Sequence, residues 1–254
     1  MLLTGASSGL GPHIARRLHA EGARLVLSGR NVAALEMLGS ELGALKVIVA
    51  DLEAPAVAEL LAVEAGEVDI LVSNAGLPAS GLLGDLDVDA IDRAIAVNLR
   101  AGIVLARALL PAMLRRGSGH LVFMGSLAAH VPGPATSIYN ATKFGLRGFA
   151  QALRMELHGS GVGVSLVSPT YVSDAGMWAE AAPGRAPSGE VTPAEVAGAV
   201  VSAIVGDRQE VKVAPAAVRV GARLHGLLPE VGERIARTAA AHPPEAVERQ
   251  RRKR

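Results

Sequence analysis

Short apolar runs alternate with longer Ala- and Leu-rich stretches along almost the whole of this 254-residue chain. Such alternation is typical of βαβ units around a parallel sheet, and near-continuous apolar strands indicate that both faces of the sheet are covered. The predicted strands are Leu2–Thr4, Arg24–Ser28, Lys46–Ala50, Ile70–Ser73, His120–Met124, Val162–Val167 and Glu210–Val213. The predicted helices are Pro12–Ala20, Val32–Leu42, Pro55–Ala65, Asp89–Leu114, Ser137–His158 and Pro193–Val205.

These elements predict an α/β fold: a Rossmann-like, doubly wound, seven-stranded parallel sheet with helices on both faces. Because βαβ crossovers are right-handed, the ligand crevice is expected beyond the carboxyl ends of the strands. Length and a half-apolar composition fit one domain over residues 1–215. The first strand is short, because only Met1, Leu2 and Leu3 precede Thr4, and the start of the chain therefore looks clipped.

The composition excludes several kinds of site. There is no cysteine, so disulfides, thiolate zinc sites and cysteine nucleophiles are absent, and we expect no metal and a reducing, cytoplasmic location. Neither a signal-like opening nor an apolar run of the ~20 residues that span a membrane is apparent. With one Trp, two Tyr and three Phe, the chain offers no stacking platform for bases, so nucleic-acid binding is not expected.

A glycine-rich loop lies directly between the first predicted strand and the first predicted helix. It reads Thr4-Gly5-Ala6-Ser7-Ser8-Gly9-Leu10-Gly11. Glycines there let the backbone approach a pyrophosphate, while free amides and the helix dipole attract the negative charge. A lone glycine loop is usually just a turn, but the flanking strand and helix favour phosphate binding. The candidate cofactor-binding residues of this loop are Gly5, Ser7, Ser8, Gly9, Leu10 and Gly11.

Tyr139 and Lys143 are four residues apart, which places them on the same face of a helix. A neighbouring ammonium lowers the pKa of a phenol from its ordinary value near ~10, as a general acid or base requires. The alternative is a packed ring beside a snorkelling amine. Ser126, thirteen positions upstream of Tyr139, adds a hydroxyl that could share the same proton.

Several motifs occur together and in order. With these motifs the chain resembles the short-chain dehydrogenase/reductase family, in its NADP-preferring branch, over residues 1 to about 215. The motifs are Thr4-Gly5-x-x-x-Gly9-x-Gly11, Asn74-Ala75-Gly76, Asn98, Ser126, Tyr139-x-x-x-Lys143 and Pro169.

The resemblance implies a nicotinamide cofactor across the strand ends. Asp51 and Leu52 would lie beside its adenine, and Asn74, Ala75 and Gly76 would lie close to it. Alternatively, Asp51 is a helix N-cap, and Asn74-Ala75-Gly76 is a turn that stabilises the sheet. The remaining cofactor-binding residues that it implies are Tyr139, Lys143, Pro169 and Val172.

The resemblance also assigns catalytic roles. Tyr139 would deliver the proton that accompanies hydride transfer, and Lys143 would lower the pKa of Tyr139 and hold the nicotinamide ribose. Ser126 would hydrogen-bond the substrate oxygen, or it merely caps a loop. Asn98 would hold water that links Lys143 to solvent, a reason for a poor helix former to stand in a helix.

The choice of cofactor follows from the end of the second strand, Ser28-Gly29-Arg30. NAD-preferring sites place a carboxylate there to bind the ribose 2′-hydroxyl, and this chain has none. A guanidinium at Arg30 would pair with a 2′-phosphate, so NADP(H) is expected over NAD(H). The alternative is that Arg30 is an ordinary solvated arginine.

The segment after the sixth predicted strand departs from the family pattern. The family usually has Pro-Gly and then a hydroxyl residue, whereas this chain reads Pro169-Thr170-Tyr171-Val172-Ser173-Asp174. Cofactor geometry there is therefore an open question. Residues 169–190 form a long loop that is expected to act as a substrate lid.

Two further segments suggest contacts with partners. Ala141, Gly145, Gly148 and Ala152 form a stripe of small residues on the predicted catalytic helix, and since this helix pairs between subunits in the family, we expect a homodimer or homotetramer. Residues 216–254 form a basic amphipathic extension, expected to end in disorder. Such a segment can lie on an anionic membrane, but a helix docked on the domain is favoured.

Together these features predict an NADP-dependent oxidoreductase that interconverts a carbonyl and a secondary alcohol. A non-catalytic Rossmann protein that binds NADP as a sensor or scaffold is the alternative from another class, because fold alone confers no activity. An epimerase or dehydratase is disfavoured, because such relatives carry a larger carboxyl-terminal substrate region.

Overall fold

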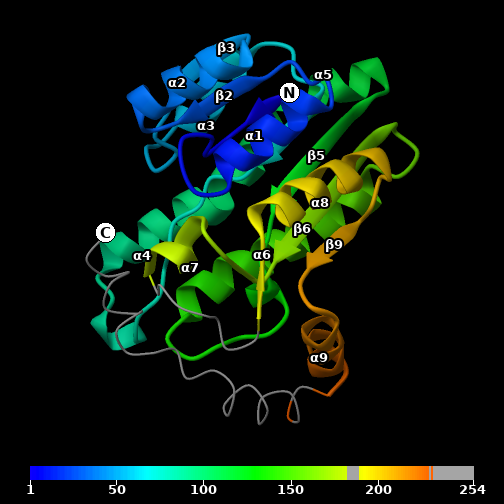
Figure 1. The fold of residues 1–254 in the computed structure, drawn as a ribbon. Helices are drawn as coiled ribbons and strands as arrows, with labels where there is room; N and C mark the ends of the chain where they lie inside the picture. The colour runs from blue at the N-terminus through cyan, green and yellow to red at the C-terminus, as the bar shows by residue number, and fades with distance from the viewer. Residues whose placement is uncertain (182–188, 229, 231–254) are drawn as a thin grey trace.

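A seven-stranded, wholly parallel sheet forms the centre of the protein in the computed structural model, which describes residues 1–181, 189–228 and 230 (Figure 1). The strand order is β3-β2-β1-β4-β5-β6-β9, which confirms the predicted doubly wound fold. The strands are β1 (Leu2–Leu3), β2 (Val26–Gly29), β3 (Lys46–Val49), β4 (Ile70–Ser73), β5 (Gly119–Met124), β6 (Val162–Pro169) and β9 (Glu210–Val213).

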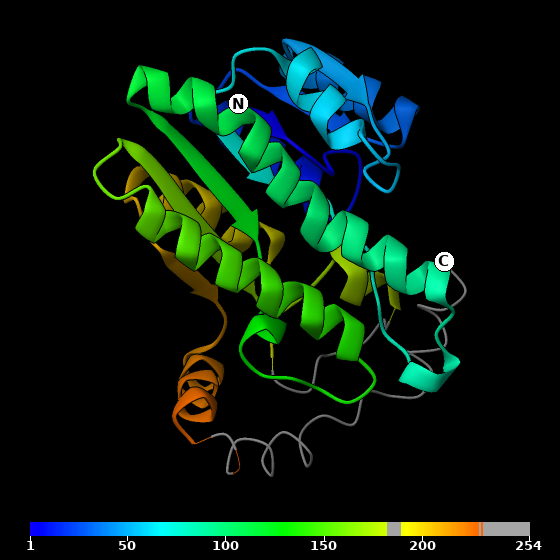
Figure 2. The same cartoon turned by 180° about the vertical axis from the view of Figure 1, so that it is seen from behind.

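Helices cover both faces of this sheet, and each face has its own apolar core. Helices α1, α2 and α8 pack on the face seen in Figure 1, and α3, α5 and α6 pack on the face seen in Figure 2. The helices are α1 (Gly11–Ala20), α2 (Val32–Leu42), α3 (Val57–Ala65), α4 (Val88–Ile95), α5 (Ala101–Arg116), α6 (Ser137–Glu156) and α8 (Pro193–Val205).

Strand β1 has two residues, yet it lies at the centre of the sheet. Leu2 and Leu3 pair with β2 on one side and with β4 on the other, and both side chains are fully buried. The pairing extends beyond the strand, since the Met1 carbonyl accepts a hydrogen bond from Val26 N (2.8 Å) and Thr4 N donates to the Val72 carbonyl (3.1 Å). The backbone on either side therefore lengthens a strand that looks short by sequence.

The predicted helix Asp89–Leu114 is a longer continuous helix, Val88–Arg116, in which a π-helical turn at Ala96–Arg100 joins α4 to α5. By length and composition this helix could cross a membrane, although Arg100 and Arg107 interrupt its apolar sequence. Its apolar side is occupied, however, because Leu105, Leu109 and Met113 are buried in the core beside the sheet. Core helices of soluble proteins meet the same criterion.

The short elements of the expected lid were not predicted, whereas a helix was expected in the carboxyl-terminal extension. A second parallel sheet pairs β7 (Tyr171–Val172) with β8 (Glu190–Val191) at the two ends of the expected lid, and α7 (Gly176–Ala181) follows β7. Helix α9 (Ala216–Leu227) begins the carboxyl-terminal extension. Residues 182–188 of the lid and 231–254 of the extension lie outside the described residues.

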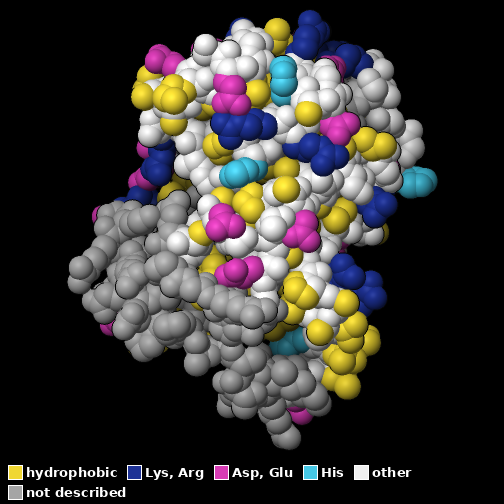
Figure 3. All heavy atoms as spheres, viewed as in Figure 1, with side chains coloured by type: hydrophobic (Ala, Val, Ile, Leu, Met, Phe, Trp, Pro, Cys, Tyr) yellow, Lys and Arg dark blue, Asp and Glu magenta, His cyan; other side chains and the backbone are white. Residues whose placement is uncertain are grey.

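Helix α9 makes little contact with the domain in the part of the chain that the structure describes. Ala222 is its one buried residue, and Val220, Leu224 and Leu227 are more than half exposed. Apolar side chains accordingly gather over α9 at the lower right of Figure 3. The docking expected for this segment is thus slight.

Candidate active site

The predicted site residues converge at the edge of the sheet where the parallel strands end. Hydrogen bonds join the loops after β1 and β4 there, and another joins α6 to the turn after β5. Ligands of open α/β sheets bind at this edge, next to the point where the strand order reverses. Here the reversal falls between β1 and β4.

The glycine loop is shaped by close backbone approaches. Gly5 has a φ of +64°, and a β-carbon on it would lie 2.8 Å from Ala75 Cα. A β-carbon on Gly11 would lie 2.1 Å from the Gly5 carbonyl oxygen, so α1 starts directly against the loop. Leu10 precedes α1 without providing a side-chain cap. The first turn of the helix therefore has the amide-rich amino terminus that binds phosphate groups.

Thr4 and Asn74 join the glycine loop to the end of β4. The Thr4 hydroxyl oxygen accepts hydrogen bonds from Asn74 N (3.0 Å) and Ala75 N (3.1 Å), and Asn74 Nδ2 donates to the Thr4 and Gly5 carbonyls (3.1 and 3.2 Å). These hydrogen bonds fit the alternative role of Asn74-Ala75-Gly76, which is to stabilise the sheet. Gly76 is still partly exposed and could contact a cofactor as well.

At the end of β2, a side chain at position 29 would have to displace Ser7. A β-carbon on Gly29 would lie 2.6 Å from Ser7 Oγ. Arg30 is exposed, and its guanidinium forms no ion pair with any residue that the structure describes. The glycine loop, the uncapped start of α1 and this unpaired cation together fit a phosphorylated dinucleotide.

Asp51 and Leu52 follow β3 at the same edge. Leu52 is buried, whereas Asp51 is exposed and its carboxylate accepts a hydrogen bond from Glu53 N (3.1 Å). The alternative that Asp51 caps the next helix is wrong, because α3 begins at Val57 rather than at Pro55. Asp51 instead closes the short turn after β3, which leaves its exposed side at the sheet edge.

Tyr139 and Ser126 meet at the centre of the site. Ser126 Oγ accepts a hydrogen bond from Ala128 N (3.1 Å), and its hydroxyl is close enough to Tyr139 to influence the pKa of the phenol. Burial raises the pKa of Tyr139, and the hydrogen bond from Ser126 opposes that rise. Ser126 therefore caps the turn, and its expected hydrogen bond to a substrate oxygen stays a prediction.

Lys143 is buried one helical turn beyond Tyr139. Its Nζ donates to the Met124 carbonyl (2.9 Å) and lies 5.6 Å from the centroid of the Tyr139 ring. Burial lowers the pKa of Lys143 to about 8, so the amine is still mainly charged at pH 7. Lys143 was expected to lower the pKa of Tyr139, but burial of the phenol raises that pKa instead. The ammonium is directed to the Met124 carbonyl at the end of β5.

Asn98 stands in the π-helical turn between α4 and α5, a feature that often marks functional positions. Its Oδ1 accepts from Leu77 N (2.6 Å) and its Nδ2 donates to the Leu77 carbonyl (2.9 Å). Both groups of the amide are thus engaged in holding the loop that follows Gly76. A water relay to Lys143 would have to use the backbone of Asn98.

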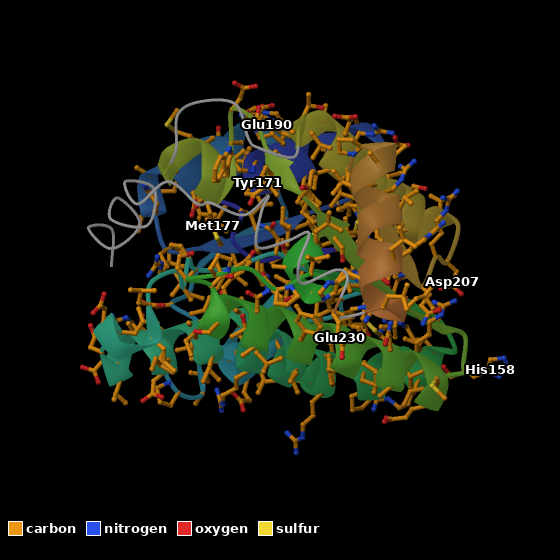
Figure 4. All side chains as sticks on the ribbon, turned by 90° about the horizontal axis from the view of Figure 1, so that it is seen from below. His158, Tyr171, Met177, Glu190, Asp207 and Glu230 are labelled. Carbon is orange, nitrogen blue, oxygen red and sulfur yellow. The ribbon has the colours of Figure 1, made fainter. Side chains whose placement is uncertain are left out.

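The start of the expected lid closes one side of the site. Pro169 ends β6 and Val172 is buried in β7, while Met177 Cε lies 3.3 Å from where a β-carbon on Gly76 would stand. In Figure 4, Met177 lies beside Tyr171 and Glu190 at this end of the molecule. A substrate entering here would meet Met177, an adaptable apolar side chain.

The departure from the family pattern after Pro169 has a local explanation. Asp174 has a φ of +58°, a conformation that Asp adopts more readily than Thr does. The side chain of Asp174 is exposed. The helix that follows this turn, α7, is held against β8 by a hydrogen bond from Trp178 Nε1 to Glu190 Oε1 (3.1 Å). Position 174 thus shapes the turn that leads into α7.

Sequence reasoning missed Asn140, which anchors the turn after Ser126. Its Nδ2 donates to the Ala128 carbonyl (2.6 Å), and its side chain also contacts Thr136. A polar residue directly beside Tyr139 on a helix was the available signal. Among the described residues, no group of three or more His, Cys, Asp or Glu side chains could hold a metal.

Comparison with known proteins places this geometry in a family. A sequence model described as short chain dehydrogenase matches residues 1–186. Ketoacyl reductase HetN of Nostoc sp. is 38% identical over 224 residues, which cover 84% of this chain and 77% of that protein. Mouse dehydrogenase/reductase SDR family member 7B is 36% identical over 184 residues, 68% of this chain, but the match spans only 57% of the length of that relative.

Solved structures agree with these sequence matches. A short-chain dehydrogenase from Sphingobium yanoikuyae in complex with NADPH superposes with a TM-score of 0.77 at 30% identity, covering 91% of this chain and 93% of that one. Serine dehydrogenase complexed with NADP⁺ gives a TM-score of 0.74 at 28% identity, covering 85% and 96%.

Proposed function

The chain belongs to the short-chain dehydrogenase family, and from this premise we propose that it is an NADP(H)-dependent oxidoreductase acting on a carbonyl or secondary alcohol. The observation that carries the proposal is the placement of Lys143 Nζ 5.6 Å from the centroid of the Tyr139 ring, with Ser126 next to the phenol at the same sheet edge as the glycine loop. Proton transfer to a carbonyl oxygen needs a positioned proton donor, and a tyrosine phenol can serve as one.

The bound nicotinamide would supply the hydride, and the chain would manage the proton. In the direction of reduction, Tyr139 donates its phenolic proton to the carbonyl oxygen as an alcohol forms. Ser126 donates a hydrogen bond that stabilises the phenolate left behind, and Lys143, one turn away, would hold the nicotinamide ribose. The phenolate then regains a proton from solvent. In oxidation each transfer runs in reverse.

We infer that NADP(H) is preferred over NAD(H). Support comes from Gly29, which stands where an NAD site has a carboxylate, and from the exposed guanidinium of Arg30, which forms no ion pair with the described residues. The solved relatives with NADPH or NADP⁺ are consistent with this preference. The residues proposed to hold the pyrophosphate are those of the glycine loop, Gly5 to Gly11.

The proposed activity is tested by following NADPH absorbance against a panel of ketones and thioesters, with alcohols and NADP⁺ run in reverse. The proposal expects turnover of at least one class of compound. Tight NADPH binding with no turnover across the panel would instead favour a sensor or scaffold.

We also propose that the chain forms a homo-oligomer through α6. Ala141, Gly145, Gly148 and Ala152 are all exposed on this helix. Phe144 and Met155 add apolar surface, with exposed fractions of 41% and 78%. Small residues permit a close approach of a second helix. In a two-fold symmetric dimer, this face of α6 would pack against the same face of α6 in the second subunit.

A further inference from the structure

Three donors from three different elements converge on one carboxylate oxygen behind the site. Glu210 Oε1, on β9, lies 2.6 Å from His130 Nε2 and 3.3 Å from Ser168 Oγ of β6. It also lies 3.5 Å from Arg147 Nε of α6, a buried nitrogen without a hydrogen-bond partner. The side chains of His130 and Glu210 are 4% and 15% exposed. None of these residues takes part in the proposed proton transfer.

His130 terminates the turn that carries Ser126. A 3-10 turn, Leu127–Ala129, connects them, and it is closed by hydrogen bonds from Ala129 N to the Ser126 carbonyl (2.9 Å) and from His130 N to the Leu127 carbonyl (2.9 Å). Such a closely bonded turn moves as one piece. A shift of the His130 imidazole would therefore also shift the hydroxyl of Ser126.

The other two donors lie next to the same machinery. Arg147 is one helical turn beyond Lys143 on α6. Ser168 packs against the residue before Ser126, since a β-carbon on Gly125 would lie 2.9 Å from Ser168 Oγ. Glu210 thus joins the Ser126 turn, the catalytic helix and the end of β6 through a single atom.

We propose that Glu210 and His130 are positioning residues, whose buried pair fixes the Ser126 turn so that its hydroxyl meets Tyr139. The second attachment of this turn, from Asn140 Nδ2 to the Ala128 carbonyl (2.6 Å), holds its middle, while the His130–Glu210 pair holds its end. The inference rests on the proposed role of Tyr139, but its test does not require turnover.

The charge state of the cluster supports this role. Burial alone would raise the pKa of Glu210, but the hydrogen bond from His130 and the charges of His130, Arg147 and Lys212 hold it below its usual value. The carboxylate is therefore ionised, accepts hydrogen bonds from His130 and Ser168, and attracts the guanidinium of Arg147. Removal of one partner from a buried, hydrogen-bonded pair leaves the other uncompensated, so the turn should lose its anchor.

The test uses the tyrosine content of the chain. Tyr139 and Tyr171 are its two tyrosines, so a Tyr171→Phe protein labelled with 3-fluorotyrosine gives a single fluorine resonance, that of position 139. A pH titration followed by ¹⁹F NMR then reports the pKa of this phenol directly. Because fluorotyrosine is more acidic than tyrosine, the titration falls at lower, milder pH.

In this background, Ser126→Ala should raise the pKa of the phenol by about one unit, the effect of one lost hydrogen bond to the phenolate. His130→Ala and Glu210→Ala should each raise it in the same direction, and the double variant should raise it no further. His130→Gln keeps an N–H near the position of Nε2 and should restore most of the original value. Glu41→Gln, which removes a remote surface carboxylate 2.6 Å from Arg16, should leave it unchanged.

Unchanged titration in His130→Ala, with a shift in Ser126→Ala, would overturn the positioning role and leave the proposed function intact. No shift in Ser126→Ala would instead overturn the Ser126–Tyr139 contact on which both proposals rest. Should Glu210→Ala not fold, His130→Ala still decides, because Arg147 continues to face the carboxylate.

Discussion

Ser7 Oγ lies 2.6 Å from the place where a β-carbon on Gly29 would stand. The glycine loop and the end of β2 are therefore in contact at the point where an NAD-specific site needs a carboxylate. Any side chain at position 29 must displace Ser7, and the neighbouring Arg30 is left as the charge that a ribose phosphate would meet.

The preference for NADP(H) predicts unequal effects at Arg30. Arg30→Ala should weaken NADPH binding about 10-fold or more, the loss expected for a charge-assisted hydrogen-bonded pair, and should barely change NADH binding. Dissociation constants from fluorescence titration with both cofactors measure this. Equal losses for NADPH and NADH would remove the basis for the preference. Arg24→Ala, an arginine before β2, serves as the control.

Two helical glycines should respond oppositely to alanine. Gly11→Ala should lower the free energy of unfolding by about 1–3 kcal/mol, because its β-carbon would lie 2.1 Å from the Gly5 carbonyl oxygen and force the loop to move. Gly198→Ala, in α8, would place a β-carbon 3.5 Å from Arg17 Nη1, an ordinary contact, and should raise stability by about 1 kcal/mol or less. Urea unfolding measures both. A harmless Gly11→Ala would contradict the close packing of α1 on the loop.

Burial of Lys143 predicts a rise in stability with pH. Its pKa is about 8 when folded and near 10.5 when unfolded, so between these values the unfolded chain binds more protons. The free energy of unfolding should then increase from pH 8 towards 10, by ~3 kcal/mol at most. The raised pKa of Tyr139 has the opposite effect, but only above about pH 10.

Urea unfolding at several pH values between 8 and 10 tests this effect of Lys143. In Lys143→Met the rise should flatten, since that variant has no amine to titrate. A rise of the same size in both proteins would mean that other groups cause it, and a fall in the wild type would contradict the burial of a charged amine.

The exposed stripe on α6 predicts an interface that a large charged side chain would break. Gly148→Arg should convert an oligomer into monomers at micromolar concentration, as measured by light scattering. A β-carbon on Gly148 meets no atom within 4 Å, so the subunit itself should tolerate the change. Met37→Arg, on an exposed position of α2 across the sheet, should leave the assembly unchanged. A monomeric wild type would remove the proposal.

Much of this architecture follows from local pattern. The alternation of strand and helix predicted all seven strands of the main sheet, because buried parallel strands are apolar throughout and crossover helices must lie between them. The motifs with Tyr139, Lys143 and Gly5 identified the family correctly. Their roles stay predictions, although the structure brings Ser126 and Tyr139 into contact.

Other features depend on contacts that no local pattern reveals. His130 and Glu210 are 80 positions apart, and only the fold brings them together. Strands β7 and β8 have two residues each, too few for periodicity to mark them. The direction of the Tyr139 pKa was also missed, because spacing reports the distance to Lys143 along a helix but not the burial of the phenol.

The most direct test of the central claim is the turnover of Tyr139→Phe on a carbonyl that the wild type reduces, measured together with NADPH affinity. The account predicts a loss of kcat of about 10²-fold or more, the scale of general acid catalysis, with the dissociation constant for NADPH nearly unchanged. If Tyr139→Phe reduced the carbonyl as fast as the wild type does, the assignment of Tyr139 as the proton donor would be contradicted.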